Sequence, residues 1–136
     1  MDSIFVVVRA FNEEPTLGGV IAELVAAGYR VVLVDDGSTD GTWKVALGWP
    51  ILAVRHPVNL GPGAALQTGF TAALRAGARF LLTVDADGQH PVGELKKVLT
   101  PLVAGEADVV FGSRFLRPED RRRVPPARQV LLAGAT

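Results

Sequence analysis

Residues 31–38, VVLVDDGS, join a run of four apolar residues to a pair of aspartates and a turn. A short, continuous, valine-rich run is typical of a strand that is buried on both faces of a parallel sheet. The same junction recurs at residues 80–87, FLLTVDAD, where a second apolar run ends at Asp85 and Asp87. The two stretches indicate an α/β protein whose sheet carries acidic side chains at the carboxyl ends of its strands.

Strand-like and helix-like segments alternate along the rest of the chain. Strands are expected at residues 4–8, 31–34, 51–54, 80–84 and 108–111. Helices are expected between them, from an N-cap at Asn12 to Gly28, then at 40–47, 61–76 and 91–102. This alternation predicts a mainly parallel sheet with helices on both faces.

The composition limits the function classes. The 136 residues suit one domain, and 14 basic against 14 acidic side chains argue against a nucleic-acid-binding protein. Cysteine is absent, which excludes disulfides and thiolate metal sites. Because no basic leader and no membrane-length apolar run occurs, a cytoplasmic protein is expected. Peripheral association with the cytoplasmic face of the membrane and oligomerisation both stay open.

Basic charge is concentrated near the end of the chain. Residues 114–128 hold six arginines and two acidic residues, a net charge of +4, so the remaining residues carry −4. One interpretation is an acidic body that binds a cation and a basic segment that binds an anion. The other is a solvated terminal segment.

The polar residues that follow the expected strands should meet at one edge of the sheet, because the carboxyl ends of parallel strands lie together and ligands bind there. Four strand ends contribute residues 9–14, Asp35 with Asp36, Asp85 with Asp87, and Ser113 with Arg114. Crowded carboxylates repel one another unless a cation neutralises them, and oxygen ligands suit Mg²⁺ or Mn²⁺. Because Mg²⁺ completes its shell with phosphate oxygens, a diphosphate-bearing substrate is expected, with Arg114 as a further phosphate contact.

Each of these features also has a structural explanation when it is taken alone. The pair Asp35 and Asp36 before Gly37 suits an ordinary turn, and Asp40 suits a helix cap. Arg9 at a strand end fits either kind of role. The occurrence of so many polar residues at one edge of the sheet favours a binding site.

Four segments carry a family resemblance: residues 8–14 (VRAFNEE), 34–42 (VDDGSTDGT), 59–66 (NLGPGAAL) and 84–91 (VDADGQHP), with GSRF following at 112–115. They resemble motifs of the nucleotide-sugar glycosyltransferases of family 2, which have the GT-A fold. The likeness is closest to the polyprenyl-phosphate (dolichol-phosphate type) mannosyl- and glucosyltransferases, and it covers about residues 3–115. Three positions depart from the family pattern: Arg9 replaces its Pro, Phe11 its Tyr, and Pro62 a frequent Lys.

The resemblance implies a reaction and the residues for it. The nucleotide would be bound by Phe11, Glu13, Asp35, Asp36, Gly63 and Ala86, with a carboxylate accepting a hydrogen bond from the base. Asp85 and Asp87 would hold Mg²⁺ or Mn²⁺ on the donor diphosphate, and Arg114 would bind the phosphates, so these three are the expected catalytic residues. A sugar would pass from UDP or GDP to a polyprenyl phosphate or a sugar acceptor, with inversion at the anomeric carbon.

Relatives continue well beyond this length. Residues 1–115 are therefore expected to be the donor-binding half of a GT-A domain, and residues 116–136 a basic segment leading into an acceptor half that this chain lacks. A non-catalytic nucleotide-binding fragment is one alternative. A HAD-type phosphatase with Asp85 as nucleophile is another, although Gln89 stands where that class has Thr or Ser.

Overall fold

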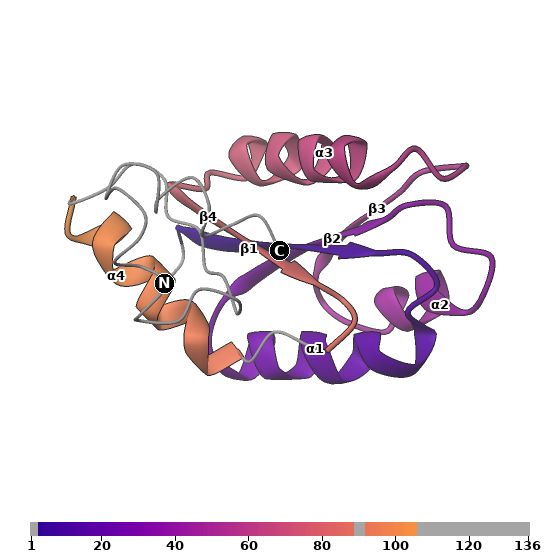
Figure 1. The fold of residues 1–136 in the computed structure, drawn as a ribbon, viewed down its shortest axis with the longest axis horizontal. Coiled ribbons are helices and arrows are strands. Elements are labelled where there is room, and N and C mark those ends of the chain that lie inside the picture. Colours follow the sequence, from indigo (N-terminus) through magenta and orange to yellow (C-terminus); the bar gives the residue numbers. More distant parts are fainter. Residues whose placement is uncertain (1–2, 89–91, 106–136) are drawn as a thin grey trace, which may run out of the picture. The chain divides into compact units, whose positions relative to one another are not determined.

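Four parallel strands form one sheet in the computed structural model, which describes residues 3–88 and 92–105. The strands are β1 (Ile4–Ala10), β2 (Arg30–Asp35), β3 (Leu52–Arg55) and β4 (Phe80–Asp85), and their order across the sheet is β3-β2-β1-β4 (Figure 1). All three pairings are parallel, which confirms the predicted sheet. The fifth strand expected at residues 108–111 lies outside the described residues.

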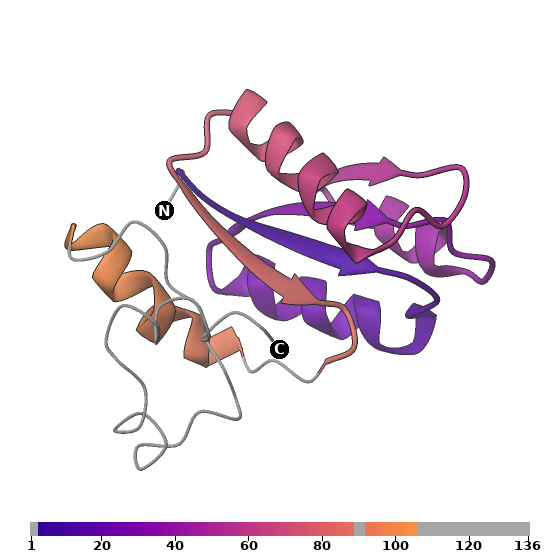
Figure 2. The same ribbon diagram turned by 45° about the horizontal axis from the view of Figure 1, so that its top comes forward.

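Helices cover both faces of the sheet, as the alternating pattern predicts. Helix α3 (Pro62–Arg75) packs on β1 and β2 from one side, whereas α1 (Glu14–Ala26) and α2 (Thr42–Leu47) lie on the other side (Figures 1 and 2). In α1 the buried residues are Leu17, Val20, Ile21 and Leu24, which recur at the spacing of one helix face. The chain divides into two compact units at Val92 and Gly93.

The core lies around the two inner strands. The side chains of Val6, Val7 and Val8 in β1 are fully buried, as are those of Val32, Leu33 and Val34 in β2. Successive residues of a strand point to opposite faces, so an unbroken buried run requires cover on both sides of the sheet. The helices on the two faces supply that cover.

The second unit contains a short helix. A single 3-10 turn, η1 (Val92–Glu94), leads into α4 (Leu95–Val103), in which Leu95 and Leu99 are buried one turn apart. The helix expected at residues 91–102 therefore forms with slightly shifted bounds. Within residues 3–88 and 92–105, no helix combines the length and the apolar character needed to span a membrane.

The start of α1 differs from the sequence-based expectation. Asn12 was expected to cap this helix, but its φ of 52° places it in the left-handed region, and Glu13 directly precedes the helix. The Asn12 side chain instead accepts a hydrogen bond from the backbone N–H of Thr39 at 2.8 Å. The N-cap prediction was wrong because this side chain ties the loop after β1 to the loop after β2.

Helix α3 approaches the sheet closely at Gly69, and this contact gives a test of the packing. A Cβ atom on Gly69 would lie 2.3 Å from Val7 Cγ1 and 3.2 Å from Val34 Cγ2. Gly69→Ala is therefore expected to lower the free energy of unfolding by about 1–3 kcal/mol, since the core must shift to admit the methyl group.

The matched control is Gly19→Ala in α1, where an added Cβ meets nothing within 4 Å. There the same substitution is expected to raise the free energy of unfolding by about 0.5–1 kcal/mol, because alanine restricts the unfolded chain. Urea denaturation of both variants measures the two changes in the free energy of unfolding, which should have opposite signs. Equal stability of the two variants would contradict the close approach of α3 to the sheet.

Candidate functional site

The order of the strands opens a crevice at one place in the sheet. The chain runs outward from β1 through β2 to β3 and then returns to add β4 on the other side of β1. The connection that leaves β1 and the connection that enters β4 lie on opposite faces of the sheet (Figure 2). In open parallel sheets such a reversal separates the connecting segments at the carboxyl ends of the strands, where ligands bind.

A pocket of about 350 Å³ lies at these carboxyl ends. It is lined by the loops after β1, β2 and β4 and by the start of α3, through Arg9, Ala10, Phe11, Glu13, Asp36, Asn59, Pro62, Ala65, Asp85, Ala86 and Asp87. Six residues with expected roles are thus brought together: Phe11, Glu13, Asp36, Asp85, Ala86 and Asp87. Four carboxylates and one guanidinium face a single cavity.

The guanidinium of this pocket belongs to Arg9. Its Nη2 atom donates a hydrogen bond to Asp85 Oδ1, and the two residues are direct partners across β1 and β4. Their side chains are 24% and 30% exposed, so the ion pair lies at the pocket wall. Arg114, from which a guanidinium was expected, lies outside the described residues.

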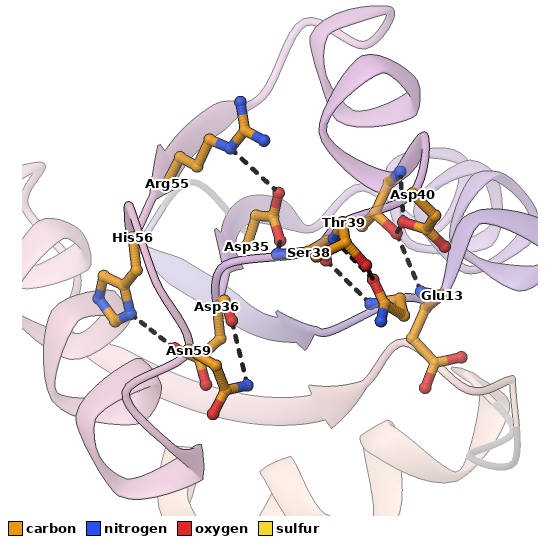
Figure 3. Close-up of polar contacts among 11 residues, drawn as sticks. Glu13, Asp35, Asp36, Ser38, Thr39, Asp40, Arg55, His56 and Asn59 are labelled. Atoms are coloured by element: carbon orange, nitrogen blue, oxygen red, sulfur yellow. Dashed lines mark hydrogen bonds and ion pairs between the residues drawn. The ribbon is translucent and has the colours of Figure 1, made fainter.

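Asp36 is held by a buried hydrogen-bond network, of which Figure 3 shows the contact with His56. Its Oδ1 atom accepts hydrogen bonds from His56 Nδ1 at 2.8 Å and from the backbone N–H of Leu60 at 2.9 Å. Its Oδ2 atom accepts one from the N–H of Gly61 at 2.9 Å, directly before α3 begins. A carboxylate has about four lone-pair positions, so these three hydrogen bonds leave about one unused.

These contacts lower the pKa of Asp36. Burial alone raises the pKa of the carboxyl group, but the hydrogen bond from His56 and those from the Leu60 and Gly61 amides together outweigh burial. The pKa therefore lies below its ordinary value of 3.8. At neutral pH, Asp36 faces the pocket as an anion that can accept a hydrogen bond but cannot donate one.

The lowered pKa of Asp36 predicts a loss of stability in acid. A depressed carboxyl pKa stabilises the fold at pH values above the unfolded pKa, and this stabilisation is lost as the pH falls through the folded value. Wild type and Asp36→Asn should therefore differ in free energy of unfolding at pH 5.5, and the difference should shrink below pH 3.8. Urea denaturation of both proteins at several pH values measures this difference in free energy of unfolding. A difference that does not change with pH would contradict the lowered pKa of Asp36.

Two of the expected nucleotide-binding residues do not line the pocket. Asp35 is fully buried, its Oδ1 atom accepts the Ser38 N–H at 3.0 Å, and its Oδ2 atom lies 3.7 Å from Arg55 Nε (Figure 3). Gly63 lies in the first turn of α3, outside the lining set. Asp35 thus shapes the loop that presents Asp36 to the pocket.

The loop after β2 also depends on a glycine. Gly37 has a φ of +76°, and a Cβ atom there would lie 2.3 Å from the carbonyl carbon of Val58. Only glycine adopts this conformation without strain and allows the two backbone segments to approach so closely. The aspartate pair and the loop at residues 56–60 can therefore lie against each other.

Hydrogen bonds hold the other wall of the pocket to α1. Thr16 donates a hydrogen bond from its hydroxyl to the carbonyl oxygen of Ala86 at 2.6 Å. Glu13 donates its backbone N–H to the Thr42 hydroxyl at 2.9 Å. The Thr16 contact ties the turn between Asp85 and Asp87 to the first turn of α1, and the Glu13 contact ties the start of α1 to the start of α2.

The donor set at the end of β4 fits a hard divalent cation. Asp85 and Asp87 offer carboxylate oxygens in one pocket, and Mg²⁺ usually takes one or two protein carboxylates and completes its shell with water and phosphate oxygens. Within the described residues, no group of three or more His, Cys, Asp or Glu side chains surrounds a common point. The two carboxylates therefore suit a cation that arrives with phosphate oxygens of its own.

Sequence reasoning missed three residues of this region. Arg9 stayed unassigned, Thr16 carried no signal, and His56 was passed over although it directly follows β3. The aspartates were found because polar residues directly after a strand mark the binding edge of the sheet, and the same rule applies to His56. Arg9 could not be paired with Asp85 before the strand order was known.

The chain resembles known proteins over most of its length. It is 30% identical over 145 residues to the UDP-N-acetylglucosamine--dolichyl-phosphate N-acetylglucosaminyltransferase of Methanococcus voltae, covering 93% of this chain and 58% of that protein. It is 34% identical over 134 residues to the polyprenol monophosphomannose synthase of Mycolicibacterium smegmatis, covering 93% and 50%. The chain thus spans about half the length of the curated relatives it matches.

A solved structure and a family model agree with this likeness. The glucosyl-3-phosphoglycerate synthase of Mycobacterium tuberculosis, in complex with Mn²⁺, UDP and glucosyl-3-phosphoglycerate, superposes with a TM-score of 0.60 at 28% identity, covering 77% of this chain and 41% of that one. This confirms the predicted GT-A type of fold. The model of the family described as Glycosyl transferase family 2 matches residues 5–134, and the chain belongs to that family.

Proposed function

We propose that this chain is the donor-binding part of a glycosyltransferase that takes a sugar from a UDP- or GDP-linked donor. The observation that carries the proposal is the pocket that the ends of β1, β2 and β4 share. Asp36 after β2 and Asp85 and Asp87 at the end of β4 line this one pocket. The relatives support it, since their names include a UDP-N-acetylglucosamine transferase and a polyprenol monophosphomannose synthase.

The two sides of the pocket suit the two ends of a nucleoside diphosphate. Phe11 is 44% exposed and offers a flat apolar face on which a base can stack. The remaining lone pair of Asp36 suits a base N–H, and Glu13 lies nearby for a ribose hydroxyl. Ala86, which lines the same pocket, is a further proposed nucleotide contact, whereas Gly63 and Asp35 lie outside the lining.

The acidic turn after β4 suits the diphosphate. In this proposal Asp85 and Asp87 hold Mg²⁺ or Mn²⁺, which when bound neutralises charge on the departing nucleoside diphosphate. Thr16 and the end of β4 keep the carboxylates in position before substrate arrives, so little reorganisation is needed as charge develops. Arg114 is proposed as a further phosphate ligand and the third catalytic residue.

The proposed acceptor is a polyprenyl phosphate. A phosphate oxygen is already ionised at neutral pH, so it can attack the anomeric carbon without a strong general base. Attack on the face opposite the leaving group inverts the configuration at that carbon. Residues 1–115 would then bind the donor, and residues 116–136 would lead toward the acceptor-binding part of the protein, at or near a membrane surface.

The proposal is tested by calorimetric titration of the chain with UDP, GDP, UDP-glucose, UDP-N-acetylglucosamine and GDP-mannose, each with and without Mn²⁺. We expect one base to be preferred and its binding to require the metal. Transfer of labelled sugar to a polyprenyl phosphate then separates an enzyme from a non-catalytic nucleotide-binding protein. Failure of all five ligands to bind with Mn²⁺ present would overturn the proposal.

A further inference from the structure

Arg9 is the only basic residue among those lining the pocket, all of which belong to the part of the chain that the structure describes. With its carboxylates ionised, the pocket carries a formal charge of −3, from four acidic groups and one arginine. A diphosphate is itself an anion, so it meets repulsion everywhere in this pocket except beside Arg9. Apart from a bound cation, this side chain is therefore the charged group of the lining that attracts phosphate oxygens.

The backbone fixes Arg9 beside the acidic turn. β1 is an inner strand, and Arg9 has Val34 of β2 and Asp85 of β4 as its direct neighbours across the sheet. Paired residues of adjacent strands project to the same face, so the guanidinium and the Asp85 carboxylate meet without any loop movement. Their ion pair is a consequence of the strand register.

The ion pair leaves hydrogen-bonding capacity unused. Arginine has five N–H donors in a planar fork that matches phosphate geometry. Asp85 takes a bond from Nη2, while the buried Nε atom of Arg9 has no hydrogen-bond partner. A buried donor without a partner is uncommon in folded proteins, so Nε is a donor that water or a ligand oxygen can complete.

We propose that Arg9 is a diphosphate-binding residue that Asp85 holds in place until the donor arrives. This inference rests on the proposed function. When a divalent cation takes up the Asp85 carboxylate, the Arg9 guanidinium is released to the donor phosphates, which sit beside the same turn. Asp85 thus has two alternative cationic partners, and Arg9 has two alternative anionic ones.

This exchange has two consequences of opposite sign. Arg9 competes with metal for Asp85, so its removal should let Mn²⁺ alone bind on the order of 10-fold more tightly. Arg9 also binds phosphate through charge-assisted hydrogen bonds, so its removal should weaken nucleotide binding at saturating Mn²⁺ by on the order of 10-fold. A residue that only held Asp85 in place would not produce both effects.

The experiment compares wild type with Arg9→Met and Arg9→Lys. Binding of Mn²⁺ alone is followed by the electron paramagnetic resonance signal of the free ion. Binding of UDP or GDP, whichever wild type prefers, is followed by calorimetry at saturating Mn²⁺. Arg79→Met is the matched control, because it also replaces an arginine by methionine. Arg79 lies directly before β4, at the end of that strand away from Asp85, and does not line the pocket.

We expect tighter Mn²⁺ binding together with weaker nucleotide binding in Arg9→Met, and neither change in Arg79→Met. Arg9→Lys keeps the charge without the planar fork, so it should retain weak Mn²⁺ binding and still lose nucleotide affinity by about 3-fold. If Arg9→Met does not fold, the expected loss of nucleotide affinity in Arg9→Lys tests the proposal by itself.

Unchanged nucleotide affinity in the folded Arg9 variants would overturn this inference while leaving the proposed function standing. If wild type itself binds neither UDP nor GDP with Mn²⁺, the proposed function falls and this inference falls with it.

Discussion

Asp87→Ala is expected to abolish metal-dependent nucleotide binding, with a loss of at least about 100-fold in affinity. Outer-shell groups around metal sites already change affinity by about 10–100-fold, and a carboxylate that binds the cation directly should contribute more. The side chain is only partly buried, so the free energy of unfolding should change by no more than about 1 kcal/mol. Calorimetry with UDP or GDP at saturating Mn²⁺, together with urea denaturation, measures both quantities.

Two further variants show where the effect arises. Glu23→Ala removes a carboxylate from the exposed face of α1 and should leave affinity unchanged. Asp85→Ala should also abolish metal-dependent binding with the fold intact, and it removes the ion pair with Arg9 as well. Wild-type affinity in both aspartate variants would exclude a metal site at the end of β4.

The sheet could be predicted from the sequence because its inner strands, β1 and β2, are buried on both faces and its outer strands are also mostly apolar runs. Their apolar runs are continuous, and glycine, proline and aspartate mark their ends, so β2 and β4 differ from the expected ranges by only one or two residues. Parallel strands share one direction, so the acidic ends of β2 and β4 could be placed at a common edge without coordinates. The pocket brings Asp36, Asp85 and Asp87 together there.

The partners of individual side chains could not be predicted, because they depend on strand order and register. A shift of one residue between β1 and β4 would turn Arg9 to the opposite face from Asp85. Asp35 ends β2 and Asp36 follows it directly, yet Asp35 lies beside Arg55 outside the pocket lining, whereas Asp36 lines the pocket. The sequence alone does not show which of the two faces a ligand.

His56 gives the last prediction, because it holds the aspartate that faces the pocket. Its side chain is 9% exposed and lies between Asp36 and Thr68, with Nδ1 at 2.8 Å from Asp36 Oδ1 and Nε2 at 2.8 Å from Thr68 Oγ1. An ionised carboxylate can only accept, so Nδ1 carries the proton of this bond. The threonine hydroxyl can donate to Nε2 or accept from it.

His56→Ala is expected to lower the free energy of unfolding by about 3 kcal/mol, because it leaves a buried carboxylate short of a donor. Nucleotide affinity should fall as well, since Asp36 loses one of the three hydrogen bonds that hold its carboxylate. Thr68→Val removes only the outer hydrogen bond and should cost about 1 kcal/mol. His56→Asn, whose amide nitrogen can take the place of Nδ1, should resemble Thr68→Val in both stability and affinity. Urea denaturation and calorimetric titration of the three variants distinguish these results, and equal losses in His56→Ala and Thr68→Val would show that Asp36 does not depend on the histidine.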